Sequence, residues 1–171
     1  IKVLVLACNT ATTAALKHLT ELLPDILVVG VVEPGAKAAV KVSSSKRIGI
    51  FATETTVNSG AYQQHITSLA KESKLSIKAC PLLVALAEEG MVDNEITNLV
   101  LNHYLNGLSE IDCLLLGCTH FPVFKSLLAD LLPKSVTIVD SALETANSVK
   151  SLLEAYDITS QGKGSTKFLV T

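Results

Sequence analysis

The chain has 171 residues, of which 49% are hydrophobic and 18% are charged, and its formal net charge is −2. This composition indicates a globular, aliphatic protein rather than a disordered one. The lysines are scattered and form no basic stripe, so we expect no nucleic-acid partner. No apolar stretch approaches the roughly 18–20 residues that span a bilayer, so we expect no membrane partner either.

The first third of the chain alternates buried strands with helices. Val3 to Ala7 is an apolar run typical of a parallel strand that is buried on both faces. A helix is predicted from Thr10 to Leu23, where Pro24 stops it. Ile26 to Val32 predicts the next strand, and Glu33 to Gly35 has the composition of a turn, at which we place a boundary between two lobes.

The same alternation continues to the last residues. Further strands are predicted over residues 48–51, 75–80, 111–116, 136–139 and 167–170, and further helices over 57–71, 81–89, 93–106, 122–132 and 142–156. Strands and helices that alternate with short connections are typical of an α/β fold with largely parallel sheets flanked by helices. We expect two similar lobes, residues 1–34 with 146–171 and residues 35–145, and an active site in the cleft between them.

The four cysteines are too sparse for a disulfide scaffold and none are spaced as C-x-x-C, so we expect free thiols in a reducing cytoplasm and no metal site. Cys80 and Cys113 have the character of ordinary core residues. Cys8 and Cys118 each follow a predicted strand, at the edge of a parallel sheet where functional groups gather. A helix start beside them would favour the thiolate over the thiol. The polar residues that follow these two thiols are Asn9, Thr10, Thr119 and His120.

Two thiols that face each other across a cleft could remove a proton from one face of a carbon atom and deliver another from the opposite face. An ordinary thiol pKa of about 8.5 needs only a modest fall to give useful thiolate near neutral pH. His120 is a natural proton partner for Cys118, whereas no equivalent residue accompanies Cys8.

Two further groups of polar side chains have two readings each. Glu88 and Glu89 occupy the last turn of a predicted helix, where acidic groups oppose the dipole, so they form either a solvated surface pair or part of a site. A cluster of hydroxyls at a strand end predicts either ordinary helix caps or a site for a carboxylate or phosphate. Its members are Thr53, Thr55, Thr56 and Ser59.

Six sequence blocks, in this order, resemble those of the bacterial glutamate racemases. They are LACNTAT, VVEPGA, TETTVNSGAY, CPLLVALAE, LLGCTHFP and IVDSALETA. A single cysteine block is weak evidence for a family, but six blocks in the same order cover nearly the whole chain and make the resemblance specific. The resemblance implies a cofactor-independent isomerase that interconverts L- and D-glutamate, a small-molecule substrate, and so supplies D-glutamate for peptidoglycan. It leaves a homodimer open.

The resemblance also implies roles for individual residues. Cys118, assisted by His120, would act on L-glutamate, and Cys8 would act on D-glutamate. Glu88 would support the site, while Glu89 stays on the surface. The implied substrate-binding residues are Asn9, Thr10, Thr53, Thr56 and Thr119.

Two departures from the racemase pattern affect these expectations. Glutamate racemases begin earlier, with an Asp-Ser-Gly motif whose aspartate partners the first cysteine and a Pro-Tyr-Gly motif, and this sequence contains neither. Thr55 stands where a glycine is usual. We therefore expect little activity from this chain alone.

Two alternatives to a glutamate racemase remain. One is a racemase of aspartate or another amino acid, and the other is a non-catalytic thiol redox or binding module. A redox pair of cysteines would need Cα atoms within about 7 Å of each other.

Overall fold

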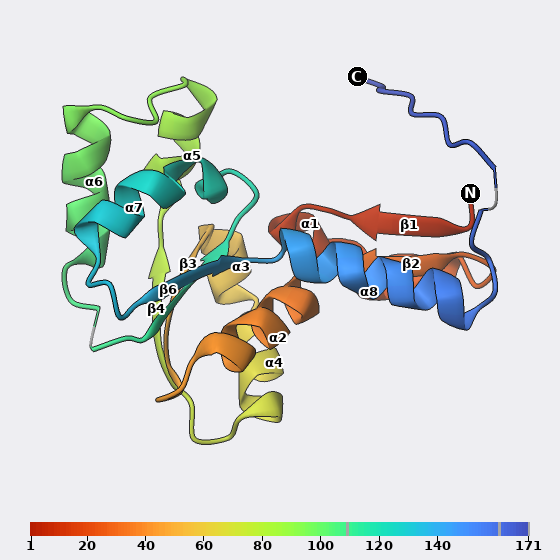
Figure 1. Ribbon diagram of the computed structural model, residues 1–171, viewed down its shortest axis with the longest axis horizontal. Coiled ribbons are helices and arrows are strands. Elements are labelled where there is room, and N and C mark those ends of the chain that lie inside the picture. Colours follow the sequence, from red (N-terminus) through yellow and green to blue (C-terminus); the bar gives the residue numbers. More distant parts are fainter. Residues whose placement is uncertain (109, 161, 171) are drawn as a thin grey trace.

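Two parallel sheets organise the molecule (Figure 1), which we describe from a computed structural model over residues 1–108, 110–160 and 162–170. The smaller sheet pairs two strands, and the larger sheet has four strands in the order β4-β3-β5-β6. All pairings are parallel. The strands are β1 (Val3–Leu6), β2 (Leu27–Gly30), β3 (Arg47–Ala52), β4 (Lys74–Ala79), β5 (Cys113–Gly117) and β6 (Thr137–Asp140).

Helices follow the strands and cover the sheets. The helices are α1 (Asn9–Leu22), α2 (Val32–Val42), α3 (Glu54–Asn58), α4 (Ala61–Leu69), α5 (Pro81–Glu88), α6 (Glu95–Leu105), α7 (Lys125–Leu131) and α8 (Ala142–Ala155), and η1 (Phe121–Phe124) is a short 3-10 helix. The predicted α/β fold with parallel sheets and flanking helices is therefore confirmed. In the part of the chain that the structure describes, no helix is long and apolar enough to cross a membrane.

Successive side chains of β3 and β5 point to opposite faces of the larger sheet, and helices cover both faces, so both sets of side chains are buried. On one face, Phe51, Leu114 and Leu116 pack with side chains of α5, α6 and α7. On the other face, Ile50 and Leu115 pack with side chains of α2 and α4. Each such side chain contributes about 1.5–3 kcal/mol when it leaves water. This sheet is the rigid platform from which the Cys118 turn extends.

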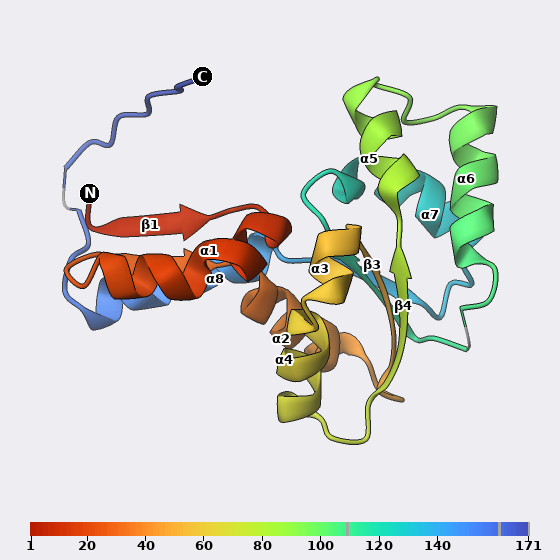
Figure 2. The ribbon, with the colours of Figure 1, turned by 180° about the vertical axis from the view of Figure 1, so that it is seen from behind.

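The smaller sheet is less enclosed. β1 and β2 lie beside α1 and α8 at one end of the molecule (Figures 1 and 2), and Val5 in β1 keeps an exposed fraction of 38%. The predicted lobe boundaries at residues 34 and 146 lie within α2 and α8. The division of the chain into lobes stays a prediction.

The predicted turn at Glu33 to Gly35 is wrong, because these residues form the beginning of α2. Pro34 is tolerated there since the first turn of a helix leaves its N–H groups without intrahelical partners. The Gly35 N–H donates to the Val31 carbonyl over 3.2 Å, which continues the helical pattern. The alanine-rich stretch that follows then extends the helix to Val42.

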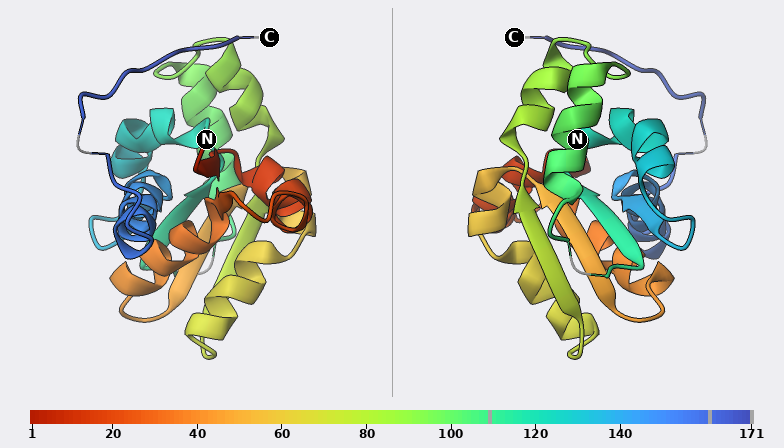
Figure 3. Two further views of the ribbon diagram at one scale, coloured as in Figure 1. Left: turned by 90° about the vertical axis from the view of Figure 1, so that its right-hand side faces the viewer. Right: turned by 90° about the vertical axis from the view of Figure 1, so that its left-hand side faces the viewer.

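Three other predicted elements differ from the structure. The helix predicted over 57–71 is broken into α3 and α4 by Gly60, whose φ of 67° is left-handed. The helix predicted over 93–106 begins at Glu95, and Asn94 caps it by accepting a hydrogen bond from the Thr97 N–H. Residues 167–170 form no strand and extend away from both sheets (Figure 3). Their apolar side chains therefore contribute no core contacts.

Candidate active site

The Cys8 turn lies at the carboxyl end of β1. Cys8 is the N-cap residue of α1 with extended backbone angles, φ −103° and ψ 131°, and its carbonyl accepts from the Thr12 N–H over 2.9 Å. The side chain is exposed. The described residues provide no hydrogen-bond partner for the Cys8 thiol. The strand and the helix thus present this sulfur to its surroundings without a fixed proton partner.

The Cys118 turn lies at the carboxyl end of β5, directly after Gly117. Cys118 is buried, with an exposed fraction of 6%, and its Sγ lies 3.7 Å from Nδ1 of His120. The Nε2 atom of the same ring contacts Oε1 of Glu88, the last residue of α5. The end of β5, the residue before η1 and the end of α5 therefore place a thiol, an imidazole and a carboxylate in one line of contacts.

This line of three groups fixes how the imidazole is used. A carboxylate accepts hydrogen bonds, so contact with Glu88 places the proton of a neutral His120 on Nε2. The Nδ1 atom is then free to accept the proton of the Cys118 thiol. A nucleophile or base whose partner is in turn oriented by a third group is a recurring catalytic arrangement. The structure therefore brings Cys118, His120 and Glu88 together, and the roles expected for them stay predictions.

The pKa of Cys118 is raised, chiefly because burial disfavours the thiolate. Hydrogen bonds from the backbone N–H groups of His120 and Phe121 oppose this rise, while the charge of Cys8 adds to it. The expectation that a helix start favours the thiolate is therefore wrong for Cys118, where a 3-10 turn follows and burial outweighs the N–H groups. Because the charge of Cys8 opposes that of Cys118, the arrangement favours one thiolate and one thiol over two thiolates.

Three threonine hydroxyls from two different helices form a cluster beside the Cys8 turn. Thr10 Oγ1 in α1 lies 2.8 Å from Thr53 Oγ1 and 3.3 Å from Thr56 Oγ1, and the last two atoms are 3.0 Å apart. Figure 2 shows the beginning of α1 next to α3. Thr53 also caps α3, so the helix-cap reading applies to this residue, and the site for a carboxylate or phosphate stays a prediction. Thr55 remains exposed in α3.

A cavity of about 730 Å³ borders the Cys118 turn. Ala7, Cys118 and Thr119 line it together with residues of α8. Cys8 is not among the described residues that line this cavity. Within the described ranges, no group of three or more histidine, cysteine, aspartate or glutamate side chains is arranged to hold a metal ion.

Known proteins match this fold and this sequence. The family model for Asp/Glu/Hydantoin racemase matches residues 1–149. The chain belongs to this family. It is 46% identical over 160 residues to a glutamate racemase of Geobacter metallireducens, and this match covers 92% of the chain and 59% of the relative.

Solved structures of glutamate racemases have the same fold. An isoform from Bacillus anthracis has a TM-score of 0.89 at 37% identity, and the match covers 94% of this chain and 61% of that one. The enzyme from Francisella tularensis, determined in complex with D-glutamate, has a TM-score of 0.86 at 31% identity, with 95% and 61% covered. The chain thus spans about three fifths of the length of the racemases that it matches.

The two remaining cysteines and one tyrosine complete the picture of the site. Cys80 and Cys113 are buried in the core as predicted, and burial raises the pKa of each to about 12.

Tyr62, whose hydroxyl donates to Asn9, was not among the predicted site residues. The sequence signal was present, because Tyr62 closes the TETTVNSGAY block, but an aromatic residue in a helix is usually part of the core.

Proposed function

We propose that the whole protein interconverts L- and D-glutamate without a cofactor, in the cytoplasm, and supplies D-glutamate for peptidoglycan. The observation that carries this proposal is the line of Cys118, His120 and Glu88 at one strand end, with Cys8 at the corresponding end of the other sheet. The family match and the glutamate racemases among its relatives support the choice of substrate.

The proposed reaction needs one proton removed and one delivered. With L-glutamate, His120 takes the proton of the Cys118 thiol, and the thiolate removes the proton from Cα. The Cys8 thiol then delivers its proton to the opposite face of the same carbon, which gives D-glutamate and a Cys8 thiolate. The reverse reaction starts from that thiolate, and transfer of the proton on His120 through solvent to the Cys8 thiolate restores two thiols and a neutral His120. A charge on either sulfur disfavours a charge on the other, which suits a proton transfer during which one sulfur is a thiolate and the other is a thiol.

Substrate binding is proposed for polar side chains near these two turns. The hydroxyls of Thr10, Thr53 and Thr56 already lie within hydrogen-bond distance of one another and would together hold a carboxylate. Asn9 and Thr119, which follow the two cysteines, would hold the remaining polar groups of the amino acid.

We also propose that these 171 residues alone have little activity. The Cys118 thiol has His120 as its proton partner, but the described residues offer no such partner to the Cys8 thiol. A thiol without a base nearby delivers and removes protons poorly.

The test follows racemisation of L-glutamate by circular dichroism in D₂O, with the longest natural polypeptide that contains these residues. Two opposed thiols predict deuterium at Cα of the D-glutamate formed and little in the recovered L-glutamate. Replacement of Cys118 by alanine should lower the rate by about 10²–10⁴-fold. The matched control is Cys113→Ala, a core thiol on the same strand, which should keep the rate. Turnover of L-aspartate but not of L-glutamate would overturn the proposed substrate.

A further inference from the structure

Tyr62 connects the two cysteine turns although it belongs to neither. It lies on α4 with an exposed fraction of 1%, and its hydroxyl donates a hydrogen bond of 2.6 Å to Oδ1 of Asn9. Asn9 directly follows Cys8 and is the first residue of α1. A buried phenol hydroxyl therefore reaches from the helix layer of the larger sheet to the turn of the smaller one.

The ring of Tyr62 contacts the other cysteine turn. A Cβ atom added to Gly117, the residue before Cys118, would lie 2.7 Å from Cε2 of Tyr62. A Cβ atom added to Gly35 in α2 would lie 3.0 Å from the Tyr62 hydroxyl oxygen. Both distances are shorter than normal carbon contacts, so glycine at these positions makes room for the ring. One side chain thus touches the neighbour of each proposed catalytic thiol.

The hydrogen bond to Tyr62 also decides which way the Asn9 amide is turned. Asn9 has an exposed fraction of 2%, and its amide oxygen is occupied by the Tyr62 hydroxyl. No acceptor among the described residues contacts the amide nitrogen at the other corner of the group, and this nitrogen is not one of the buried polar atoms that lack a partner. It is therefore reached by solvent and is free to bind a ligand that brings an acceptor. The N–H₂ group is therefore the end that Asn9 offers.

We propose that Tyr62 is a positioning residue of the racemase: its hydroxyl holds the Asn9 amide with the nitrogen directed to a carboxylate of the substrate. This inference rests on the proposed function and adds a residue to it. Burial raises the pKa of Tyr62, and the charges of Cys118 and Asp140 raise it further, so the hydroxyl remains a donor over the working pH range. Without this hydroxyl, the amide could turn its oxygen toward the substrate carboxylate and repel it.

The experiment measures kcat and KM for both enantiomers in the full natural polypeptide. Tyr62→Phe keeps the ring against Gly117 and removes only the hydroxyl. We expect KM for both enantiomers to rise about 5–10-fold while kcat changes less than about twofold, because binding to Asn9 is lost in the ground state and the transition state alike. Tyr104→Phe is the matched control, since it removes the hydroxyl of another buried tyrosine, one on α6 at the opposite face of the larger sheet that accepts from the Leu82 N–H, and it should leave KM unchanged.

A double-variant cycle separates positioning from general stability. If Tyr62 acts through Asn9, adding Tyr62→Phe to Asn9→Ala should raise KM no further, because the two changes remove one interaction. The inference would be overturned if the KM increases of the two single variants multiplied in the double variant. It would also be overturned if Tyr62→Phe had a lower melting temperature but an unchanged KM. Should Tyr62→Phe not fold, Asn9→Asp carries the test, because it keeps an acceptor for Tyr62 and replaces the donor with a negative oxygen. A KM rise smaller than that of Asn9→Ala would then reject the proposal.

The wild-type measurement distinguishes the two levels of the hypothesis. An inactive wild-type protein would mean that the proposed function fails. An active wild-type protein whose KM does not respond to Tyr62→Phe would leave the function standing and remove only the role of Tyr62.

Discussion

Cys8 and Cys118 each follow a parallel strand, yet one thiol is exposed without a side-chain partner and the other is buried against His120. The first strand belongs to an open two-stranded sheet, and the second is the centre of a sheet covered on both faces. Equivalent positions in the fold therefore place the two sulfurs, whereas burial of Cys118 raises its pKa and the surroundings of each sulfur decide whether it has a proton partner. A repeated motif predicts where a group lies better than how it titrates.

After replacement of Cys118 itself, the largest expected effect comes from removing the partner that only the Cys118 turn possesses. In the full natural polypeptide, His120→Ala should lower kcat by about 10²-fold in both directions, because the buried thiol loses the base that accepts its proton. Initial rates with L- and D-glutamate measure this effect. The control is His103→Ala, an exposed histidine of α6, which should keep kcat. If kcat of His120→Ala equals that of His103→Ala, Cys118 needs no histidine partner, and in this respect it does not differ from Cys8.

A second variant disturbs the platform beneath the same turn. Gly117→Ala places a methyl group 2.7 Å from Tyr62 and 3.1 Å from the Phe51 carbonyl oxygen, so the backbone before Cys118 must shift. We expect a loss of about 1–3 kcal/mol in unfolding free energy and a lower kcat, measured by urea denaturation and circular dichroism. Gly164→Ala is the control, because nothing lies within 4 Å of its added Cβ. Unchanged stability would show that the turn yields easily.

A smaller effect is expected from the outer member of the Cys118 line. Glu88→Gln keeps a side chain that can contact His120 but removes its charge, so kcat should fall only about 3–10-fold, because Glu88 is exposed and water can replace it. Its neighbour provides the matched control, since Glu89→Gln removes a charge one residue away from the contact and should change kcat little. If both variants lose the same activity, the general charge of this helix end matters and the contact does not.

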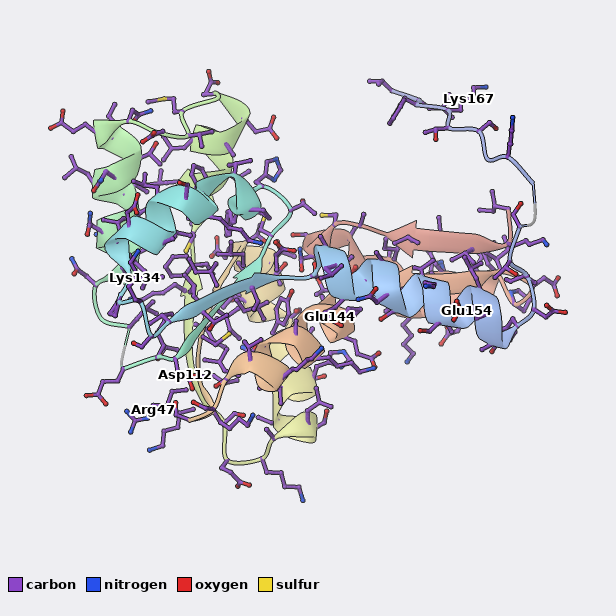
Figure 4. All side chains as sticks on the ribbon, viewed as in Figure 1. Arg47, Asp112, Lys134, Glu144, Glu154 and Lys167 are labelled. Atoms are coloured by element: carbon purple, nitrogen blue, oxygen red, sulfur yellow. The ribbon has the colours of Figure 1, made fainter. Side chains whose placement is uncertain are left out.

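The smallest effect on catalysis is expected at the end of the larger sheet opposite the thiols, where Figure 4 labels Asp112. Burial alone would raise the pKa of Asp112, but hydrogen bonds from Ser43, Ser44 and Ser45 outweigh it and hold this pKa below its ordinary value of 3.8. The stabilisation is therefore complete above that value and is lost as the pH falls toward the lower pKa of the folded protein.

Asp112→Asn tests this separation of stability from catalysis. The variant should unfold about 1–2 kcal/mol more easily in urea at pH 7, and the difference from wild type should shrink below pH 3.8, while KM and kcat stay unchanged. A stability difference that is independent of pH would contradict the role of the charge.

The sequence predicted the six strands of the two sheets because most contain a short apolar run, as over Cys113 to Leu116, whereas the apolar run at residues 167–170 forms no strand. Spacing alone paired Cys118 with His120, and only the family blocks connected Glu88 to this site; the structure places the three side chains in contact, while their roles stay predictions. The start of α2 was missed because Pro34 and Gly35 are common in turns, and the contact with Tyr62 that requires Gly35 comes from a distant helix. The raised pKa of Cys118 was missed because burial depends on tertiary packing.

The threonine cluster of Thr10, Thr53 and Thr56 has a consequence for the energetics of the proposed substrate binding. These hydroxyls hold one another in place, so their side-chain rotamers need no large change to bind a ligand. A carboxylate would find the three oxygens positioned, and only the hydroxyl hydrogens would have to swing outward to meet it. Recognition at this point would then cost little entropy and almost no movement of heavy atoms.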